Sequence, residues 1–136
     1  MIVVDASALA KYLLREEGWE EVSRYVRTMR PLYSLDHVLK EVTNAVWKDA
    51  STRKVITSKF AMRLYGLVER LVDSQVIILE NELKHLKRAL EIALEHDVTV
   101  YDALYIAQAE NYGEILTSDE KQGEIARKLR IKVHKI

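Results

Sequence analysis

The chain has 136 residues, with 21 Asp plus Glu, 21 Lys plus Arg and no cysteine. This length predicts one domain, residues 1–136, that can bury a core without a disulfide. The absence of cysteine excludes thiolate metal sites and cysteine nucleophiles. A net charge of zero argues against holding nucleic acid by bulk charge alone. No secretory signal and no apolar run of about 18 residues is visible, so we expect a cytoplasmic protein without a membrane segment.

Short apolar runs alternate with longer amphipathic segments, a pattern typical of α/β domains with a parallel sheet. The runs that predict strands are residues 2–4, 32–34, 76–79, 115–117 and 131–134. Apolar residues at helical spacing predict helices over residues 7–14, 18–29, 57–72, 82–96, 101–112 and 120–129, with a further helix capped by Asp36. Right-handed crossovers then give a three-layer α/β/α sandwich around a mostly parallel sheet of about five strands.

The helical periodicity also predicts which side chains face the core. In residues 57–72 the inward set is Phe60, Leu64, Leu67, Val68 and Leu71. In residues 82–96 it is Leu83, Leu86, Leu90 and Ala93. Gly113 stands where a left-handed cap would end the helix before it.

Four acidic residues occupy positions that such a sheet would bring together. Asp5 ends the first strand, and Asp119 follows the strand at 115–117 across Ser118. In an open parallel sheet, ligands bind beyond the carboxyl ends of the strands. Asp102 opens a helix. Glu41 lies three residues from Val38 and four from Ala45, so it borders the buried face of its own helix.

Each acid also has a plainer explanation. Asp5 and Asp119 suit helix N-caps, Asp102 complements a helix dipole, and Glu41 fits a solvated helix face. As a set, however, clustered carboxylates repel one another unless they take up protons or bind a cation. Oxygen ligands suit Mg²⁺ or Mn²⁺, and such ions activate water and polarise phosphoryl oxygens. The set therefore predicts a metal site for phosphodiester hydrolysis, with Asn44 one helical turn from Glu41.

Basic side chains gather in one short segment. They are Lys48, Arg53, Lys54 and Lys59, together with Arg63. They fit either solvated helix faces or a phosphate-binding groove beside the acids. Five aromatic residues fit either base stacking or packing and a dimer interface, and we favour packing: Tyr33, Trp47, Tyr65, Tyr101 and Tyr105. The four histidines lack metal-ligand spacing, so we expect them at the surface or at helix ends: His37, His85, His96 and His134.

Four segments carry a resemblance to a known family. They read VDASAL at residues 4–9, EVTNA at 41–45, YDALY at 101–105 and LTSD at 116–119. In this order, and over nearly the whole chain, they resemble PIN domains, above all the VapC-type toxins. The resemblance implies a Mg²⁺- or Mn²⁺-dependent endoribonuclease with an acidic quartet at Asp5, Glu41, Asp102 and Asp119, supported by Ser7 or Ser118. It also implies an RNA substrate, a homodimer and neutralisation by a cognate antitoxin protein.

Other interpretations of the same residues have less support than the resemblance to PIN domains. A haloacid-dehalogenase-like hydrolase requires a second Asp two residues after the first, where this chain has Ser7. A receiver-type signalling domain requires an acceptor Asp after the middle strand, where this chain has Glu80. A non-toxin RNA-processing PIN nuclease and a catalytically inactive PIN scaffold that binds RNA or protein both stay open.

Overall fold

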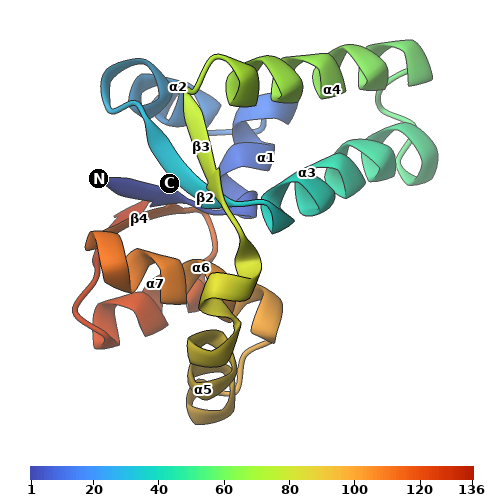
Figure 1. The fold of residues 1–136 in the computed structure, drawn as a ribbon. Coiled ribbons are helices and arrows are strands. Elements are labelled where there is room, and N and C mark those ends of the chain that lie inside the picture. The colour runs from blue at the N-terminus through green and yellow to red at the C-terminus, as the bar shows by residue number, and fades with distance from the viewer.

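In a computed structural model that describes residues 1–136, five strands form one central sheet between two layers of helices (Figure 1). The strands are β1 (Ile2–Val4), β2 (Leu32–Leu35), β3 (Ile77–Glu80), β4 (Glu114–Thr117) and β5 (Lys132–Lys135). Their spatial order is β3-β2-β1-β4-β5, and every neighbouring pair is parallel. The predicted α/β/α sandwich is therefore confirmed, with each strand boundary within about one residue of its expected place.

The helices divide by position in the chain between the two faces of the sheet. One layer contains α1 (Ala6–Leu14), α2 (Trp19–Thr28), α3 (His37–Trp47) and α4 (Ser58–Asp73). The other contains α5 (Leu86–His96), α6 (Val100–Tyr112) and α7 (Glu120–Lys128). A π-helical turn, η1 (Lys48–Thr52), extends α3, and a 3₁₀ turn, η2 (Glu82–His85), leads into α5. In Figure 1, α3 and α4 project past the sheet as an arm. No helix is both long and apolar enough to cross a membrane.

Helix α6 is the central helix of its layer. It packs against β1, β2 and β4 on one side and against α5 and α7 on the other. All residues from 103 to 109 are buried, which is the pattern of a helix enclosed by protein. The helix ends at Gly113, whose φ of 93° places it in the left-handed region as predicted. Its N-terminal turn is held at the carboxyl edge of the sheet by this packing.

The order of the strands creates a crevice at the end of β1. From β1 the chain moves outward through β2 to β3, then crosses to the other side of β1 through β4 to β5. At such a switch point the connections after neighbouring strands run to opposite faces, and a crevice opens between them. Asp5 and Asp119 follow the two strands that flank it, and the Asp5 N–H donates to the Leu116 carbonyl at 3.2 Å.

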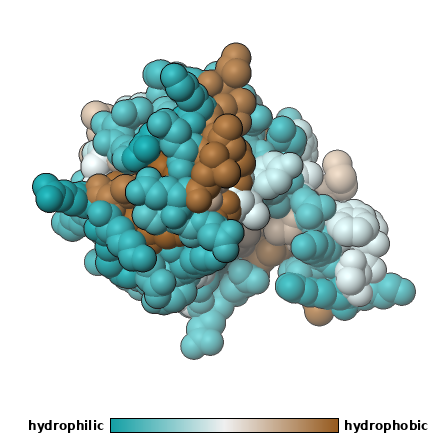
Figure 2. Space-filling model, turned by 90° about the horizontal axis from the view of Figure 1, so that it is seen from below, coloured by the Kyte–Doolittle hydropathy of each residue, from teal (hydrophilic) through white to brown (hydrophobic).

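Three predicted inward side chains face outward. Leu83 is 72% exposed and Leu90 is 51% exposed, and Figure 2 shows an apolar band on the face that carries α5. Residues 82–96 do not form one continuous α-helix, because η2 changes the period before Leu86 and takes Leu83 out of the stripe. Phe60 is 45% exposed, since it lies in the first turn of α4, on the arm. The buried residues of α5 are Ala89, Ile92 and Ala93. The two alanines are small enough to let α5 pack closely on α6.

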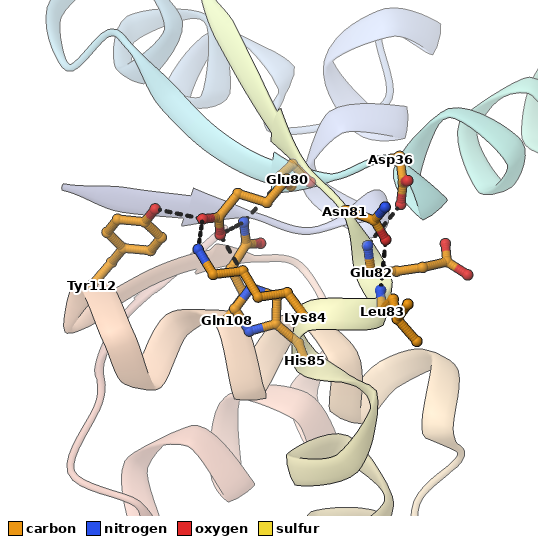
Figure 3. Close-up of polar contacts among 10 residues, drawn as sticks. Asp36, Glu80, Asn81, Glu82, Leu83, Lys84, His85, Gln108 and Tyr112 are labelled. Carbon is orange, nitrogen blue, oxygen red and sulfur yellow. Dashed lines mark hydrogen bonds and ion pairs between the residues drawn. The ribbon is translucent and has the colours of Figure 1, made fainter.

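Asp36 also differs from its predicted role. It stands at the N-cap position of α3, but its side chain makes no capping bond to that helix. Its Oδ1 instead accepts a hydrogen bond from the Glu82 N–H at 3.1 Å, and so ties the end of β2 to η2 (Figure 3). A partner from a distant segment has thus replaced the local one.

Candidate active site

The four predicted acids line one cavity of about 270 Å³ at the switch point. They reach it from four places: Asp5 from the end of β1, Glu41 from α3, Asp102 from the first turn of α6, and Asp119 from the end of β4. Ser7 lines the same cavity. The structure therefore brings together carboxylates from both helical layers and from two neighbouring strands.

Asp5 is the most deeply buried of these acids, at 1% exposed. It caps α1, and its Oδ1 accepts hydrogen bonds from the Ala8 N–H at 2.9 Å and the Ser7 hydroxyl at 2.7 Å. Its Oδ2 accepts one from the Thr117 hydroxyl. Burial raises the pKa of Asp5 to about 6, and the negative charge of Asp119 acts in the same direction, while the hydrogen bonds oppose both. The capping role and the cavity position coexist in one side chain.

Two hydroxyl groups link Asp5 to the loop after β4. Thr117 is fully buried, and its Oγ1 also accepts the Asp119 N–H at 3.0 Å. The Ser7 Oγ accepts the Ser118 N–H at 2.9 Å. Ser7 thus supports Asp5 through its side chain, whereas Ser118 contacts Ser7 through its backbone N–H. Sequence reasoning missed Thr117, although a hydroxyl residue at the end of the strand that pairs with β1 was a usable signal.

Asp102 and Asp119 are connected through Gln122. Asp119 caps α7, and its Oδ1 accepts the Gln122 N–H at 2.8 Å. The Gln122 side chain is buried and donates from Nε2 to the Asp102 carbonyl at 2.7 Å. The pKa of Asp102 is raised, chiefly by partial burial and then by the charges of Asp119 and Glu41. The acids are therefore close enough to repel one another.

A second cavity, of about 300 Å³, continues from the first. It shares Ala10, Glu41 and Ala45 with the acid cavity, and its further lining includes Asn44, Lys48 and Arg53. Arg53 also contacts Asp49, with 3.1 Å between Nη1 and Oδ1. Lys54 and Lys59 line neither cavity. The structure places two of the four predicted cationic side chains beside the acids.

The aromatic residues separate into packed and exposed ones. Tyr33 stacks on Tyr112, with ring centroids 4.6 Å apart, and Tyr105 is fully buried. Tyr101 lies against His37 and stays largely exposed. Trp47 and Tyr65 are 55% and 41% exposed and line an apolar groove of about 610 Å³ between α3 and α4. Of the five, these two have the most freely available ring faces near the basic segment.

The histidines were expected at the surface or at helix ends, and three of them are more enclosed than a freely exposed side chain. His134 lies within β5, where its ring nitrogens contact Glu114 at 2.7 Å and Tyr25 at 2.9 Å. His37 and His85 stand at helix ends but are buried. Each of these three rings lies beside a carboxylate, and the contact of His85 with Glu80 satisfies a polar atom of a buried ring.

Glu80 was considered only as a missing aspartate, yet it is the hub of a polar cluster (Figure 3). It is the last residue of β3, and it takes contacts from Gln108 and Tyr112 on α6 at 2.9 and 3.0 Å, and from Lys84 and His85, both at 3.1 Å. Burial acts to raise the pKa of Glu80, but these four partners outweigh it and lower the pKa to about 2. Glu80 thereby fastens the edge strand to the helix that carries Asp102.

The donor set in the acid cavity suits a hard divalent cation. Carboxylate and hydroxyl oxygens are the ligands that Mg²⁺ and Mn²⁺ prefer, and the mutual repulsion of the acids would be relieved by positive charge. No three acidic or histidine side chains are grouped closely enough to hold an ion between them directly. Mg²⁺ commonly keeps several waters and takes one or two carboxylates, so the arrangement fits an ion held partly through water.

A parallel five-stranded sheet with acids at its switch point, and helices on both faces, defines a PIN-like fold. The PIN domain profile matches residues 2–128, and the chain belongs to the PIN domain family. It is 37% identical over 124 residues to the protein named Ribonuclease VapC3 of Pyrobaculum aerophilum, covering 90% of this chain and 92% of that one. It is 28% identical over 120 residues to Exonuclease VapC9 of the same organism, covering 88% of this chain and 80% of that one.

Proposed function

We propose that this chain is a metal-dependent endoribonuclease that hydrolyses RNA phosphodiester bonds, and that it is the toxin of a type II toxin–antitoxin pair. The observation that carries the proposal is the convergence of Asp5, Glu41, Asp102 and Asp119 on one cavity at the switch point of the sheet. The similarity to Ribonuclease VapC3 over nine-tenths of the chain supports the same activity.

Each side chain has a role in this proposal. Asp5, Asp102 and Asp119, with Glu41 beside them, hold Mg²⁺ or Mn²⁺ directly or through water. When bound, such an ion would activate a water molecule for attack and polarise the phosphoryl oxygen. Ser7 and the Ser118 N–H keep the Asp5 loop against the β4 loop. Without a cation, the acids repel the RNA phosphates.

The neighbouring cavity supplies the RNA contacts. Lys48 and Arg53 offer positive charge to phosphates beside the acids, and Asn44 offers a neutral donor. Lys54 and Lys59 act on RNA only at longer range, since they line neither cavity. Trp47 and Tyr65 are the aromatic side chains best placed to stack on bases.

An antitoxin protein is the second partner in this proposal. The cavities join along α3: the apolar groove shares Thr43, Trp47 and Tyr65 with a shallow hollow, and that hollow shares Asn44 with the cavity beside the acids. One protein segment can therefore cover apolar side chains and reach the carboxylates. The exposed leucines of α5 offer a separate apolar surface for the proposed homodimer. We also propose a cytoplasmic location, which is compatible with an RNA substrate.

The test is cleavage of mixed single-stranded RNA and of tRNA with Mg²⁺, with Mn²⁺ and with a chelator. We expect metal-dependent cutting by the wild type and by Asp73→Asn, an exposed control at the end of α4, but not by Asp102→Asn. No cutting with either metal, from a folded protein that binds neither, would favour the inactive scaffold.

An exonuclease is the second candidate, because one relative carries that name. A circular RNA has no ends, so only an endonuclease can open it. We expect the wild type to linearise a circular substrate in Mn²⁺. Degradation of linear RNA alone, with circular RNA left intact, would assign exonuclease activity.

A further inference from the structure

Helix α6 presents one stripe of polar and aromatic side chains to β2, β3 and α3. Its members are Tyr101, Tyr105, Gln108 and Tyr112, spaced by one helical turn at each step. Tyr112 donates to Glu80 at 3.0 Å, and Gln108 donates to Glu80 and to the Ser34 carbonyl. Tyr105 is the member of this stripe whose polar group contacts one of the four cavity acids.

The Tyr105 hydroxyl donates to the Glu41 Oε1 at 2.6 Å, and the residue is 1% exposed. The His37 Nε2 lies 3.1 Å from the same oxygen but makes no well-aligned hydrogen bond. The Glu41 Oε2 accepts no hydrogen bond within the protein, and the side chain is 32% exposed. One carboxylate oxygen of Glu41 is therefore fixed, and the other is left without a protein partner.

This hydrogen bond joins acids from opposite layers of the fold. Tyr105 lies three residues after Asp102 on α6, so the two side chains lie on adjacent parts of one helix face. Glu41 comes from α3, and its charge and that of Asp102 repel each other. A glutamate free to choose among rotamers would turn away from Asp102 toward water. The Tyr105 hydroxyl holds it toward the helix that carries Asp102.

We propose that Tyr105 is a positioning residue that holds Glu41 by one oxygen and leaves the other for the divalent cation. The inference rests on the proposed function only in taking Glu41 as part of the metal site. A tyrosine phenol carries its proton at neutral pH, so the Tyr105 hydroxyl acts as a neutral donor to Glu41. Groups that orient metal ligands in this way typically change metal affinity when removed.

The test is Mn²⁺ binding by isothermal titration calorimetry, with Tyr105→Phe as the variant. We expect Mn²⁺ to bind roughly 10- to 100-fold more weakly. Tyr112→Phe is the matched control, because it removes a hydroxyl from the same helix that also donates to a glutamate, in this case Glu80. We expect Tyr112→Phe to bind Mn²⁺ like the wild type, which separates positioning from a general loosening of α6.

A double-mutant cycle shows whether Tyr105 acts through Glu41. In a Glu41→Gln background, we expect Tyr105→Phe to cause little further loss of Mn²⁺ affinity. An equal loss in both backgrounds, or wild-type affinity in Tyr105→Phe, overturns the positioning role. A wild type that binds no Mn²⁺ overturns both proposals. A wild type that binds Mn²⁺ but cuts no RNA contradicts the nuclease alone, because the calorimetric readout does not depend on cleavage.

Discussion

The hydroxyl of Thr117 donates a hydrogen bond to Oδ2 of Asp5, although the two residues are 112 positions apart. Strands β4 and β1 are neighbours, with Leu116 in register with Val4, so the residues that follow them meet at the edge of the sheet. The same Thr117 oxygen accepts the Asp119 N–H. One hydroxyl thus fixes the spacing between two of the four acids.

We predict that Thr117→Val destabilises the protein by about 1–3 kcal/mol, because it leaves a buried carboxylate oxygen and the Asp119 N–H without their partner. Valine has nearly the same shape as threonine, so packing changes little. Urea unfolding followed by circular dichroism measures the difference. Thr117→Ser keeps the hydroxyl, so we expect it to lose much less stability than Thr117→Val. Equal stability of the Val and Ser variants would show that the hydroxyl is energetically unimportant.

We predict that Asp5→Asn stabilises the metal-free protein while abolishing cleavage. The pKa of Asp5 is raised from 3.8 to about 6, so its ionised form destabilises the native state at neutral pH, by about 1–3 kcal/mol. The native state binds the proton more tightly than the unfolded chain does. Wild-type stability in chelator should therefore rise as the pH falls from 7 through 6, and this rise should be smaller in Asp5→Asn. Thermal unfolding at several pH values tests both statements, and a less stable variant at pH 7 would contradict them.

We predict that Glu80→Gln changes the pH dependence of stability in the opposite sense to Asp5→Asn. The pKa of Glu80 is lowered to about 2, so its charged form contributes stability above the unfolded pKa of about 4.5. That contribution is lost as the pH falls toward 2. We expect Glu80→Gln to cost about 1–3 kcal/mol at pH 7, with the deficit shrinking below pH 4.5. Glu69→Gln, on the exposed side of α4, is the control and should match the wild type in urea unfolding. A constant deficit at all pH values would mean that packing, and not charge, is responsible.

Lys48 and Lys59 should differ in their effect on RNA. Lys48 lines the cavity beside the acids, whereas Lys59 lies on the arm outside it. We expect Lys48→Ala to weaken binding to single-stranded RNA several-fold and to reduce the salt dependence by roughly one phosphate contact. Fluorescence anisotropy at several salt concentrations, with Mg²⁺ replaced by Ca²⁺ to limit cleavage, measures this. An equal effect of Lys59→Ala would indicate a diffuse attraction and no defined groove.

The sheet and the identity of the cavity acids could be predicted from the sequence, for simple physical reasons. Buried parallel strands read as β-branched runs, and the residues after them meet at one edge of the sheet. That rule needs no side-chain detail, and it placed Asp5 and Asp119 near each other. Glu41 was found because it borders the apolar stripe of its helix.

The contacts between the two helical layers could not be predicted from the sequence pattern. The Tyr105–Glu41 bond joins residues 64 positions apart and depends on how α3 and α6 are rotated about their axes. The Glu80 cluster depends on η2, a change of helical period that the leucine pattern of residues 82–96 concealed. Asp36 shows the same limit, because its side chain bonds to the distant Glu82 N–H and makes no capping bond to its own helix.

The crossover that puts β4 beside β1 also determines when the cavity lined by the four acids can form as the chain is synthesised on the ribosome. A ribosome that has released the chain only as far as α6 has already made Asp5, Glu41 and Asp102. Such a nascent chain lacks β4, which carries Thr117 and leads to Asp119 and Gln122, so the hydrogen bonds from Thr117 to Asp5 and from Gln122 to the Asp102 carbonyl cannot yet form. A protein that cuts RNA would thus acquire its cutting centre only once β4 and the start of α7 have been made and have folded against the earlier strands.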